Sequence, residues 1–419
     1  MISMFITIKE RLEYMKQIKY LILGAGPAGL AFANMLKRKK ENSFLVLEKE
    51  AEAGGLCRSA MVDGSYFDIG GGHFLDVKRP EVNKFLFEFM PQDEWNLFER
   101  DSRIVMGNKT VSHPLEANIW QFDLDTQVDY LSSIAKSGCN RGEPVPSKFV
   151  DWIVWKLGEK AAKEYMIPYN EKMFSNDLNE LGTYWLDKLP DVSFEDTLRS
   201  CLTKRPYGTQ PGHARFYYPK KYGYGELWLR MAKSIENHVL YHTQAEKMDC
   251  DARSITTAAG EIYKAEVIVT TIPWTEFKSI SGMPEELAAS IRHLKSSAIE
   301  TRYVAENLDT KAHWIYIPAL DIPYHRILVR HNFCQGSKGY WTETRSDRIS
   351  MFQQNNACPR WINPYAYPLN TIGKPEIIKN LLDYCTPRQI YGLGRWGEHS
   401  HYNSDVVVEL AMNLAHKLA

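Results

Sequence analysis

Residues 18–40, IKYLILGAGPAGLAFANMLKRKK, join a short apolar run to three glycines and a helical pattern. The run YLIL suits a strand of a parallel sheet that is buried on both faces, and apolar residues recur at helical spacing after Gly29. Residues 43–50, SFLVLEKE, predict the next strand. The unit is therefore β-α-β, and its G-x-G-x-x-G pattern stands where a strand turns into a helix.

Each glycine of this pattern has an expected role in binding a dinucleotide. Gly24 allows the tight turn, Gly26 lets the backbone approach a pyrophosphate, and Gly29 lets the helix pack on the strand. The helix N-terminus offers free N–H groups to the anion. Glu48, 24 residues after Gly24, is placed to accept the ribose hydroxyls. An acidic residue here favours a free 2′-hydroxyl, so the sequence predicts FAD or NAD over NADP.

The stretch EKEAEAGGLCRSAMVDGSYFDIGGGHF, residues 48–74, favours FAD over NAD. A simple NAD enzyme needs one glycine loop, whereas this chain adds Gly54 and Gly55 and then the cluster Gly70–Gly72. A flat tricyclic ring lying against main chain needs residues without side chains. Arg58 is expected along the pyrophosphate or the ring, with a surface salt bridge as the alternative interpretation.

The composition excludes several other classes of protein. Lys plus Arg equals Asp plus Glu at 51 each, which argues against a general nucleic-acid binder or an anionic-membrane protein. The seven cysteines form no C-x-x-C pair, so we expect neither a metal site nor a disulfide framework, and a reducing cytoplasm suits them. The N-terminus lacks a signal-peptide core, and no run of about 18 apolar residues suggests membrane insertion.

The length of 419 residues favours two domains or one large composite fold. Helical patterns dominate residues 79–215, strands follow in 239–273, and two strands broken by prolines are expected in 313–333. We predict an α/β protein whose discontinuous Rossmann-like FAD-binding domain comprises residues 16–78, 216–275 and 386–419. A helical, nucleotide-side region of residues 79–215 and an antiparallel-sheet substrate region of residues 276–385 are inserted in it, and residues 1–15 form an N-terminal extension.

The ordered glycine loop, trailing carboxylate, second glycine pair and Asp-x-Gly-Gly resemble the flavin-dependent family that includes amine oxidases, protoporphyrinogen oxidase and the UDP-galactopyranose mutases. The resemblance implies that GRWGEHSHYNSD, residues 394–405, lays Gly394, Arg395 and Gly397 beside the flavin. The glycine pattern and the resemblance together place these residues at FAD: Gly24, Ala25, Gly26, Ala28, Gly29, Glu48, Gly54, Gly55, Leu56, Arg58, Gly71, Gly72, His73, Gly394, Arg395 and Gly397.

Five stretches, in the family's order, resemble the mutase branch, and its eukaryotic-type members, more than the oxidases. They are DIGGGHF (68–74), ERDSRIVMGNKTVSHPLEANIWQF (99–122), FVDWIVWKLGEKAAKEYMIPYNEKMF (149–174), HWIYIPALDIPYHRILVRHNF (313–333) and NPYAYPL (363–369). The resemblance implies that Arg326 clamps a substrate diphosphate between Tyr316 and Tyr367, with Tyr169 and Asn170 near the nucleotide. A guanidinium and phenols suit those oxygens, whereas a solvated strand arginine and a core tyrosine are the alternatives.

The departures from the mutase pattern concern the diphosphate. Where the family has LGERV after Tyr-Trp, with its second clamp arginine, this chain has LDKLP, so Leu189 takes the arginine's place and Lys188 is a displaced substitute. Phe333 replaces a tyrosine, and the tail has become GEHSHY. Either the substrate differs from UDP-galactose, or the clamp is rebuilt with Lys188, Arg330 or Lys220.

The resemblance implies an FAD-dependent pyranose/furanose mutase acting on a nucleotide sugar. In that reaction N5 of the reduced flavin attacks the anomeric carbon, so NADPH or NADH would serve as reductant. Arg326 and Tyr367 would hold the leaving diphosphate, and His73 would tune the flavin, unless His73 is a structural histidine bonded within its loop. The alternatives are an FAD-dependent oxidoreductase resembling the amine or protoporphyrinogen oxidases, and a flavoprotein without catalysis.

Overall fold

A parallel sheet assembled from distant parts of the chain forms the centre of the fold. The computed structural model describes residues 18–186, 191–208, 214–351 and 358–419. Strands β10 (Val239–Leu240), β2 (Phe44–Leu47), β1 (Tyr20–Leu23), β14 (Val267–Thr270) and β21 (Ile390–Gly392) lie in that order, each parallel to its neighbour. The predicted α/β class with a Rossmann-like sheet is confirmed.

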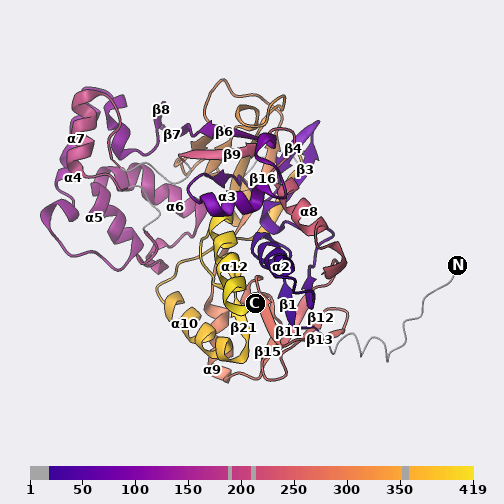
Figure 1. Cartoon of the computed structure of the whole chain (residues 1–419). Coiled ribbons are helices and arrows are strands. Elements are labelled where there is room, and N and C mark those ends of the chain that lie inside the picture. The colour runs from indigo at the N-terminus through magenta and orange to yellow at the C-terminus, as the bar shows by residue number, and fades with distance from the viewer. Residues whose placement is uncertain (1–17, 187–190, 209–213, 352–357) are drawn as a thin grey trace, which may run out of the picture.

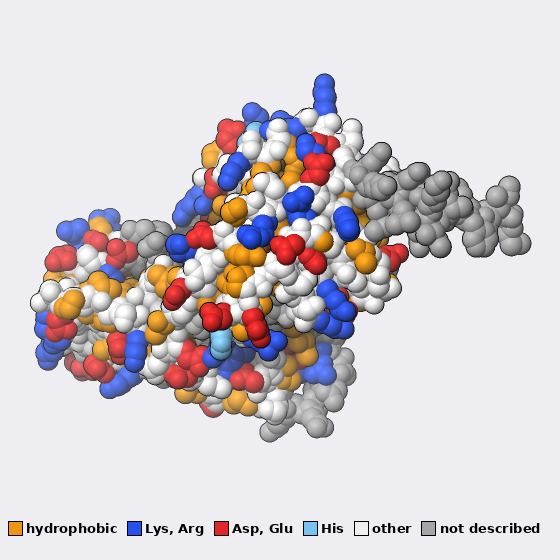
Figure 2. Space-filling model, turned by 90° about the horizontal axis from the view of Figure 1, so that it is seen from below, with side chains coloured by type: hydrophobic (Ala, Val, Ile, Leu, Met, Phe, Trp, Pro, Cys, Tyr) orange, Lys and Arg blue, Asp and Glu red, His pale blue; other side chains and the backbone are white. Residues whose placement is uncertain are grey.

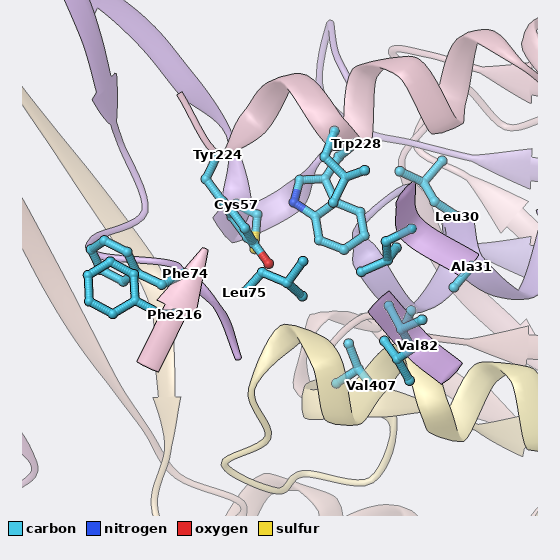
Figure 3. Packing of buried hydrophobic residues seen from close by; sticks show 14 of the residues in the cluster. Leu30, Ala31, Cys57, Phe74, Leu75, Val82, Phe216, Tyr224, Trp228 and Val407 are labelled. Atoms are coloured by element: carbon cyan, nitrogen blue, oxygen red, sulfur yellow. The ribbon is translucent and has the colours of Figure 1, made fainter. Parts of the chain in front are cut away.

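Helices cover one face of this sheet. α2 (Pro27–Arg38) packs against α12 (Ser404–Leu418) and α8 (Gly225–Lys233), and α3 (Pro80–Phe87) packs against α12. Figure 3 shows Leu30 of α2, Val82 of α3 and Val407 of α12 in this core, with Trp228 of α8 beside them. The hydroxyl of Tyr20 donates to the carbonyl of the last turn of α12, so the C-terminus is tied to the first strand.

The other face of the sheet carries a second core. Leu21 and Leu23 of β1 point into it, whereas Tyr20 and Ile22 point into the first core. A four-stranded sheet of β13 (Ile262–Lys264), β12 (Ser254–Thr257), β11 (Ala245–Asp249) and β15 (Ser279–Ser281) contributes to this side, together with α10 (Lys374–Cys385) and the nearby α9 (Glu285–Ser290). The alternation explains why β1 reads as a continuous apolar run.

A seven-stranded sheet lies apart from the parallel sheet. Its order is β20 (Arg360–Pro368), β16 (Ser296–Val304), β19 (Tyr340–Arg345), β18 (Arg326–Leu328), β17 (Trp314–Tyr316), β7 (Ser102–Met106) and β8 (Lys109–Ser112). Every neighbouring pair is antiparallel except β17 and β7. The two strands expected in residues 313–333 are therefore present as β17 and β18.

The stretch predicted to be helical, residues 79–215, is only partly so. Its strands β7 and β8 join the seven-stranded sheet, and β6 (Trp95–Glu99) pairs with β9 (Arg215–Pro219), which also pairs with β5 (Leu75–Asp76). The turn between β7 and β8 contains Gly107 at φ +61°, a conformation typical of a hairpin rather than a helix. The proposed division into domains stays a prediction.

The remaining part of that stretch forms a helical lobe on one side of the molecule (Figure 1). It contains α4 (Leu124–Ala135), α5 (Phe149–Ala161), α6 (Ile167–Met173) and α7 (Phe194–Thr203). Gly158 interrupts α5 at φ +74°, where a Cβ would lie 2.5 Å from the Ser133 carbonyl oxygen. None of the helices among the described residues is both long and apolar enough to cross a membrane.

Candidate cofactor and substrate sites

The first glycine loop has the geometry of an anion-binding turn. Gly24 adopts φ +99°, and a Cβ on Gly29 would lie 2.0 Å from the Gly24 carbonyl oxygen, so helix and strand touch through glycine. No side chain caps the first turn of α2, and Gly26 and Pro27 line a cavity at that helix end. Free N–H groups and the positive end of the helix dipole therefore face the cavity, which suits a pyrophosphate.

Glu48 follows β2 and is held by the backbone around it. Its two carboxylate oxygens accept hydrogen bonds from the N–H groups of Ala25 at 2.7 Å and Glu50 at 2.9 Å. Only 6% of the residue is exposed, yet it lines the cavity, whereas Ala25 is fully buried behind it. The lone pairs that remain on Glu48 suit the hydroxyls of a ribose.

The second glycine pair packs against the backbone of the first glycine loop. Gly54 and Gly55 have φ +115° and +53°, and a Cβ on Gly55 would lie 3.3 Å from the Cα of Gly26. Arg58 donates to the Gly55 carbonyl oxygen at 3.0 Å and to Glu50 at 3.2 Å. Arg58 thus forms the salt bridge of the alternative interpretation and also lines the cavity.

The third cluster, Gly70–Gly72, is required by protein packing. A Cβ would lie 1.8 Å from the Leu56 carbonyl oxygen at Gly70, 2.8 Å from the Glu343 carboxylate at Gly71, and 1.9 Å from Leu328 at Gly72. The loop therefore lies against β18 and β19 of the seven-stranded sheet. Packing against protein accounts for these glycines, and the contact of Gly71 and Gly72 with FAD stays a prediction.

His73 connects this loop to the cavity that it lines. Its Nδ1 lies 3.0 Å from the Gly71 carbonyl oxygen, which only accepts, so Nδ1 carries the proton and Nε2 is an acceptor. Burial, and then the positive charge of Arg395, lower the pKa of His73 to about 4. The ring is therefore neutral at pH 7. The hydrogen bond to Gly71 is what a structural histidine bonded within its loop would form. The position on the cavity wall is what a histidine that tunes the flavin would need.

Arg395 lines the cavity, whereas Gly394 and Gly397 pack against protein and their contact with FAD stays a prediction. A Cβ on Gly394 would lie 2.8 Å from the Ala28 Cβ, and one on Gly397 would lie 2.3 Å from the Thr270 carbonyl oxygen. Arg395, in α11 (Gly394–Gly397), donates to the carbonyls of Tyr402 and Ala366, and burial lowers its pKa. A guanidinium bound to carbonyls and facing a cavity suits an oxygen-rich or anionic ligand.

The cavity encloses about 1360 Å³, counting the open solvent at its mouth. Leu56 and Ala28 line it as predicted. The cavity is also lined by residues that were not predicted from the sequence to bind the cofactor: Thr243, Gln244, Ala245, Thr271, Ile272, Pro273, Asn363, Pro364, Tyr365, Tyr402, Asn403 and Ser404. Residues 271–273 directly follow β14, and the rule that ligands bind beyond the carboxyl ends of parallel strands could have identified them.

Arg326 forms a buried ion pair that the sequence did not reveal. Its Nε donates to Glu343 at 3.0 Å, a second nitrogen bonds the same carboxylate, and Tyr367 accepts at 3.2 Å. The other oxygen of Glu343 accepts from the N–H of Gly72 at 3.1 Å. Although burial opposes it, the Arg326 charge lowers the pKa of Glu343 to about 2. Glu343 therefore joins the glycine loop to the predicted substrate arginine.

The other predicted substrate residues lie in part around Arg326. Tyr316 is its partner across β17 and β18, and the ring of Tyr169 meets that of Tyr316 edge-on at 5.4 Å. Asn170 is buried, and its amide donates to the Met166 carbonyl oxygen within its own helix. Lys188 and Leu189 lie outside the described residues.

The other two suggested clamp cations, Arg330 and Lys220, differ in burial. Arg330 is fully buried and donates to the carbonyls of Val62, Ser65 and Tyr66, so it fastens the hairpin of β3 (Ser59–Val62) and β4 (Ser65–Asp68). Lys220 is exposed just after β9. The suggestion that Arg330 rebuilds the clamp is wrong, because its three nitrogens donate to the hairpin, to the Lys338 carbonyl oxygen and to the Tyr303 hydroxyl. The suggestion of Lys220 stays a prediction.

Comparison with known proteins supports the nucleotide-binding sheet. Residues 22–89 match the NAD(P)-binding Rossmann-like domain family. Over 53 residues the chain is 45% identical to an uncharacterized protein in the nifH2 3′ region of Methanothermococcus thermolithotrophicus, which is 13% of this chain and 50% of that protein. The chain thus spans about half the length of that curated relative.

Solved structures share the whole fold. A crystal structure of reduced UDP-galactopyranose mutase matches with a TM-score of 0.85 at 21% identity, covering 96% of this chain and 93% of that one. A candidate protoporphyrinogen oxidase from Exiguobacterium sp. 255-15 matches with a TM-score of 0.70 at 13% identity, covering 96% and 98%. The chain therefore has the fold shared by these two structures.

Proposed function

We propose that this chain is an FAD-dependent mutase that interconverts the pyranose and furanose forms of a nucleotide sugar. The observation that carries the proposal is the place of Arg326, Tyr316 and Tyr367. They stand on the sheet that packs against the loop carrying His73, beside a cavity suited to FAD. The likeness to reduced UDP-galactopyranose mutase over nearly the whole chain supports this reading.

Within this proposal the chain holds the cofactor at four places. The end of α2 binds the pyrophosphate, Glu48 accepts the ribose hydroxyls, and Arg395 and His73 lie towards the flavin ring. When bound and reduced, FAD supplies a nucleophilic nitrogen, N5, for the anomeric carbon. Reduction by NADPH or NADH precedes the first turnover.

The chain's own residues act on the leaving diphosphate. Arg326 and Tyr367 donate hydrogen bonds to its oxygens and stabilise the charge that develops there. Neutral His73 offers Nε2 as an acceptor on the cavity wall, where it orients a neighbouring N–H or O–H group. Tyr169 and Asn170 belong to the nucleotide side. Membership of the eukaryotic-type branch stays a prediction.

One observation favours a second candidate, an FAD-dependent oxidoreductase. Arg326 is already paired with Glu343, and Leu189 takes the place of the family's second clamp arginine. The likeness to the candidate protoporphyrinogen oxidase shows that the same fold accommodates that alternative. An oxidoreductase of this type would take hydride from a C–H bond, such as the one next to an amine nitrogen, and would need an electron acceptor instead of a reductant.

The decisive experiment uses purified protein with its flavin content measured from the visible spectrum. Dithionite-reduced protein is incubated with a panel of UDP-, GDP- and dTDP-hexopyranoses, and the products are separated by chromatography. We expect one nucleotide sugar to be converted to its furanose form, and only under reducing conditions. Normal FAD content without conversion of any sugar would overturn the mutase, and oxygen-dependent turnover of an amine or porphyrin-type substrate would support the oxidoreductase.

A further inference from the structure

Three neighbouring strands present a row of polar side chains towards the Gly70–His73 loop. Tyr316 on β17 is opposite Arg326 on β18, which in turn is opposite Glu343 on β19. Residues opposite one another in adjacent strands share one face of a sheet. The row therefore runs from Tyr316 through Arg326 to Glu343, and Gly72 bonds to its Glu343 end.

Arg100 extends this row at its Tyr316 end. Its guanidinium lies over the Trp314 ring at 4.8 Å, its Nε donates to the hydroxyl of Ser102, and a second nitrogen donates to the hydroxyl of Tyr316. Trp314 and Tyr316 are two residues apart on β17, so they share a face. The backbone N–H of Arg100 donates to the Ala214 carbonyl oxygen at 2.9 Å, which fixes the start of the segment. Arg100 and Arg326 thus lie on either side of Tyr316.

The hydroxyl of Tyr316 has a defined hydrogen-bond role in this arrangement. It accepts from Arg100, so its own proton remains available to donate to another oxygen. Tyr169 meets the Tyr316 ring from α6, and Tyr367 accepts from Arg326. The row offers two guanidiniums and phenol hydroxyls, a donor set for a ligand with several anionic oxygens.

The charge of Glu343 means that Arg326 alone is a weak ligand for a dianion. Glu343 stays ionised, since its pKa is held at about 2, and it neutralises Arg326 at close range. A diphosphate at Arg326 therefore needs a second cation. Of the cations suggested as substitutes, Arg330 is used by its hairpin, Lys220 is exposed after β9, and Lys188 lies outside the described residues.

We propose that Arg100 is the second cation of the diphosphate clamp, standing in for the arginine that Leu189 replaces, with Tyr316 donating between Arg100 and Arg326. The ligand class is a nucleoside diphosphate or its sugar ester. The inference rests on the proposed function for the identity of the ligand, and it assigns Arg100 as a binding residue for the diphosphate alone.

The test measures binding of UDP and, separately, of inorganic pyrophosphate to the flavin-loaded protein by calorimetry. Arg100→Met removes the charge and keeps much of the length, and Arg100→Lys keeps the charge without the fork. We expect Arg100→Met to weaken both ligands roughly 10- to 100-fold, as for lost charge-assisted hydrogen bonds, and Arg100→Lys to recover part of the loss. FAD content and the thermal midpoint are recorded for every variant.

Arg103→Met is the matched control. Arg103 lies on β7 beside Ile315, on the opposite face from Tyr316, and pairs with Asp101. We expect it to change binding less than about twofold. Unchanged UDP and pyrophosphate affinity in both Arg100 variants, or no binding of either ligand by the native protein, would overturn the clamp. If pyrophosphate binding depends on Arg100 but no nucleotide sugar is converted, the role of Arg100 in the clamp is supported and the proposed mutase activity is overturned.

Discussion

At the scale of single residues, we expect the buried ion pair between Glu343 and Arg326 to stabilise the folded protein. Glu343→Gln leaves the Arg326 guanidinium without a counter-charge in a site where only 1% of the Glu343 side chain and 16% of the Arg326 side chain are exposed. We expect the free energy of unfolding at pH 7 to fall by about 3 kcal/mol, measured by urea denaturation. The folded pKa of about 2 lies below the ordinary 4.5, so this contribution is complete above pH 4.5 and is lost as the pH falls towards 2.

Glu159→Gln makes the same change in an exposed ion pair with Lys163, where the side chains are 64% and 73% exposed. We expect a loss below about 0.5 kcal/mol in the free energy of unfolding there, and equal losses in the two variants would contradict the role given to Glu343.

A comparison of Glu48 with Glu343 shows which site residues can be predicted from sequence. Glu48 was found because it stands at a fixed spacing after a local motif, whereas Glu343 acquires its role from pairing between strands.

At the scale of elements, the contact of β1 with α2 depends on Gly29. A Cβ there would lie 2.0 Å from a backbone oxygen that no side-chain rotation can move, so Gly29→Ala must push the helix away from the strand. We expect a loss of about 3 kcal/mol in the free energy of unfolding, together with weaker FAD binding in a fluorescence titration. Gly373→Ala is the control, because Gly373 has nothing within 4 Å of its Cβ position, and we expect a change within about 1 kcal/mol.

The elements also separate into those that sequence predicts and those that it does not. The β1-α2-β2 unit was predicted because each step, from strand to glycine turn to helix, is encoded by adjacent residues. The membership of β7 in the seven-stranded sheet was missed, because its partner β17 lies far along the chain and the flanking sequence is rich in helical patterns. The glycines at 70–72 were predicted to lie at the flavin ring, which stays a prediction. Their contacts with Leu56, Glu343 and Leu328 were not predicted, because two of these residues lie far along the chain.

At the scale of the whole molecule, one face can be compared with the balanced composition. Figure 2 shows Lys and Arg interspersed with Asp and Glu over the described part of one face, as the equal counts of 51 lead one to expect. The fold class followed from the sequence because the parallel sheet repeats one local pattern, a buried apolar strand. The position of the row Tyr316, Arg326 and Glu343 relative to the cavity could not be predicted from the sequence, since it depends on how the two sheets pack around the Gly70–His73 loop.

Several histidines whose pKa is lowered by burial, His73 among them, make the stability of the whole fold sensitive to acid. Burial lowers the pKa of His313, His325 and His399 to about 4, so between pH 6.5 and 4 the unfolded chain binds protons that the folded chain does not. Each histidine should then lower the free energy of unfolding by about 1.4 kcal/mol per pH unit as the pH falls, with no further loss below 4. In His399→Asn, the slope of the free energy of unfolding against pH should fall by the contribution of one histidine. The slope is measured from denaturation curves at several pH values and fixed FAD concentration. His242→Asn controls for the substitution, since both residues have positive φ, at 46° and 53°, and His242 is exposed. An unchanged slope in His399→Asn would exclude His399 as one of the groups responsible.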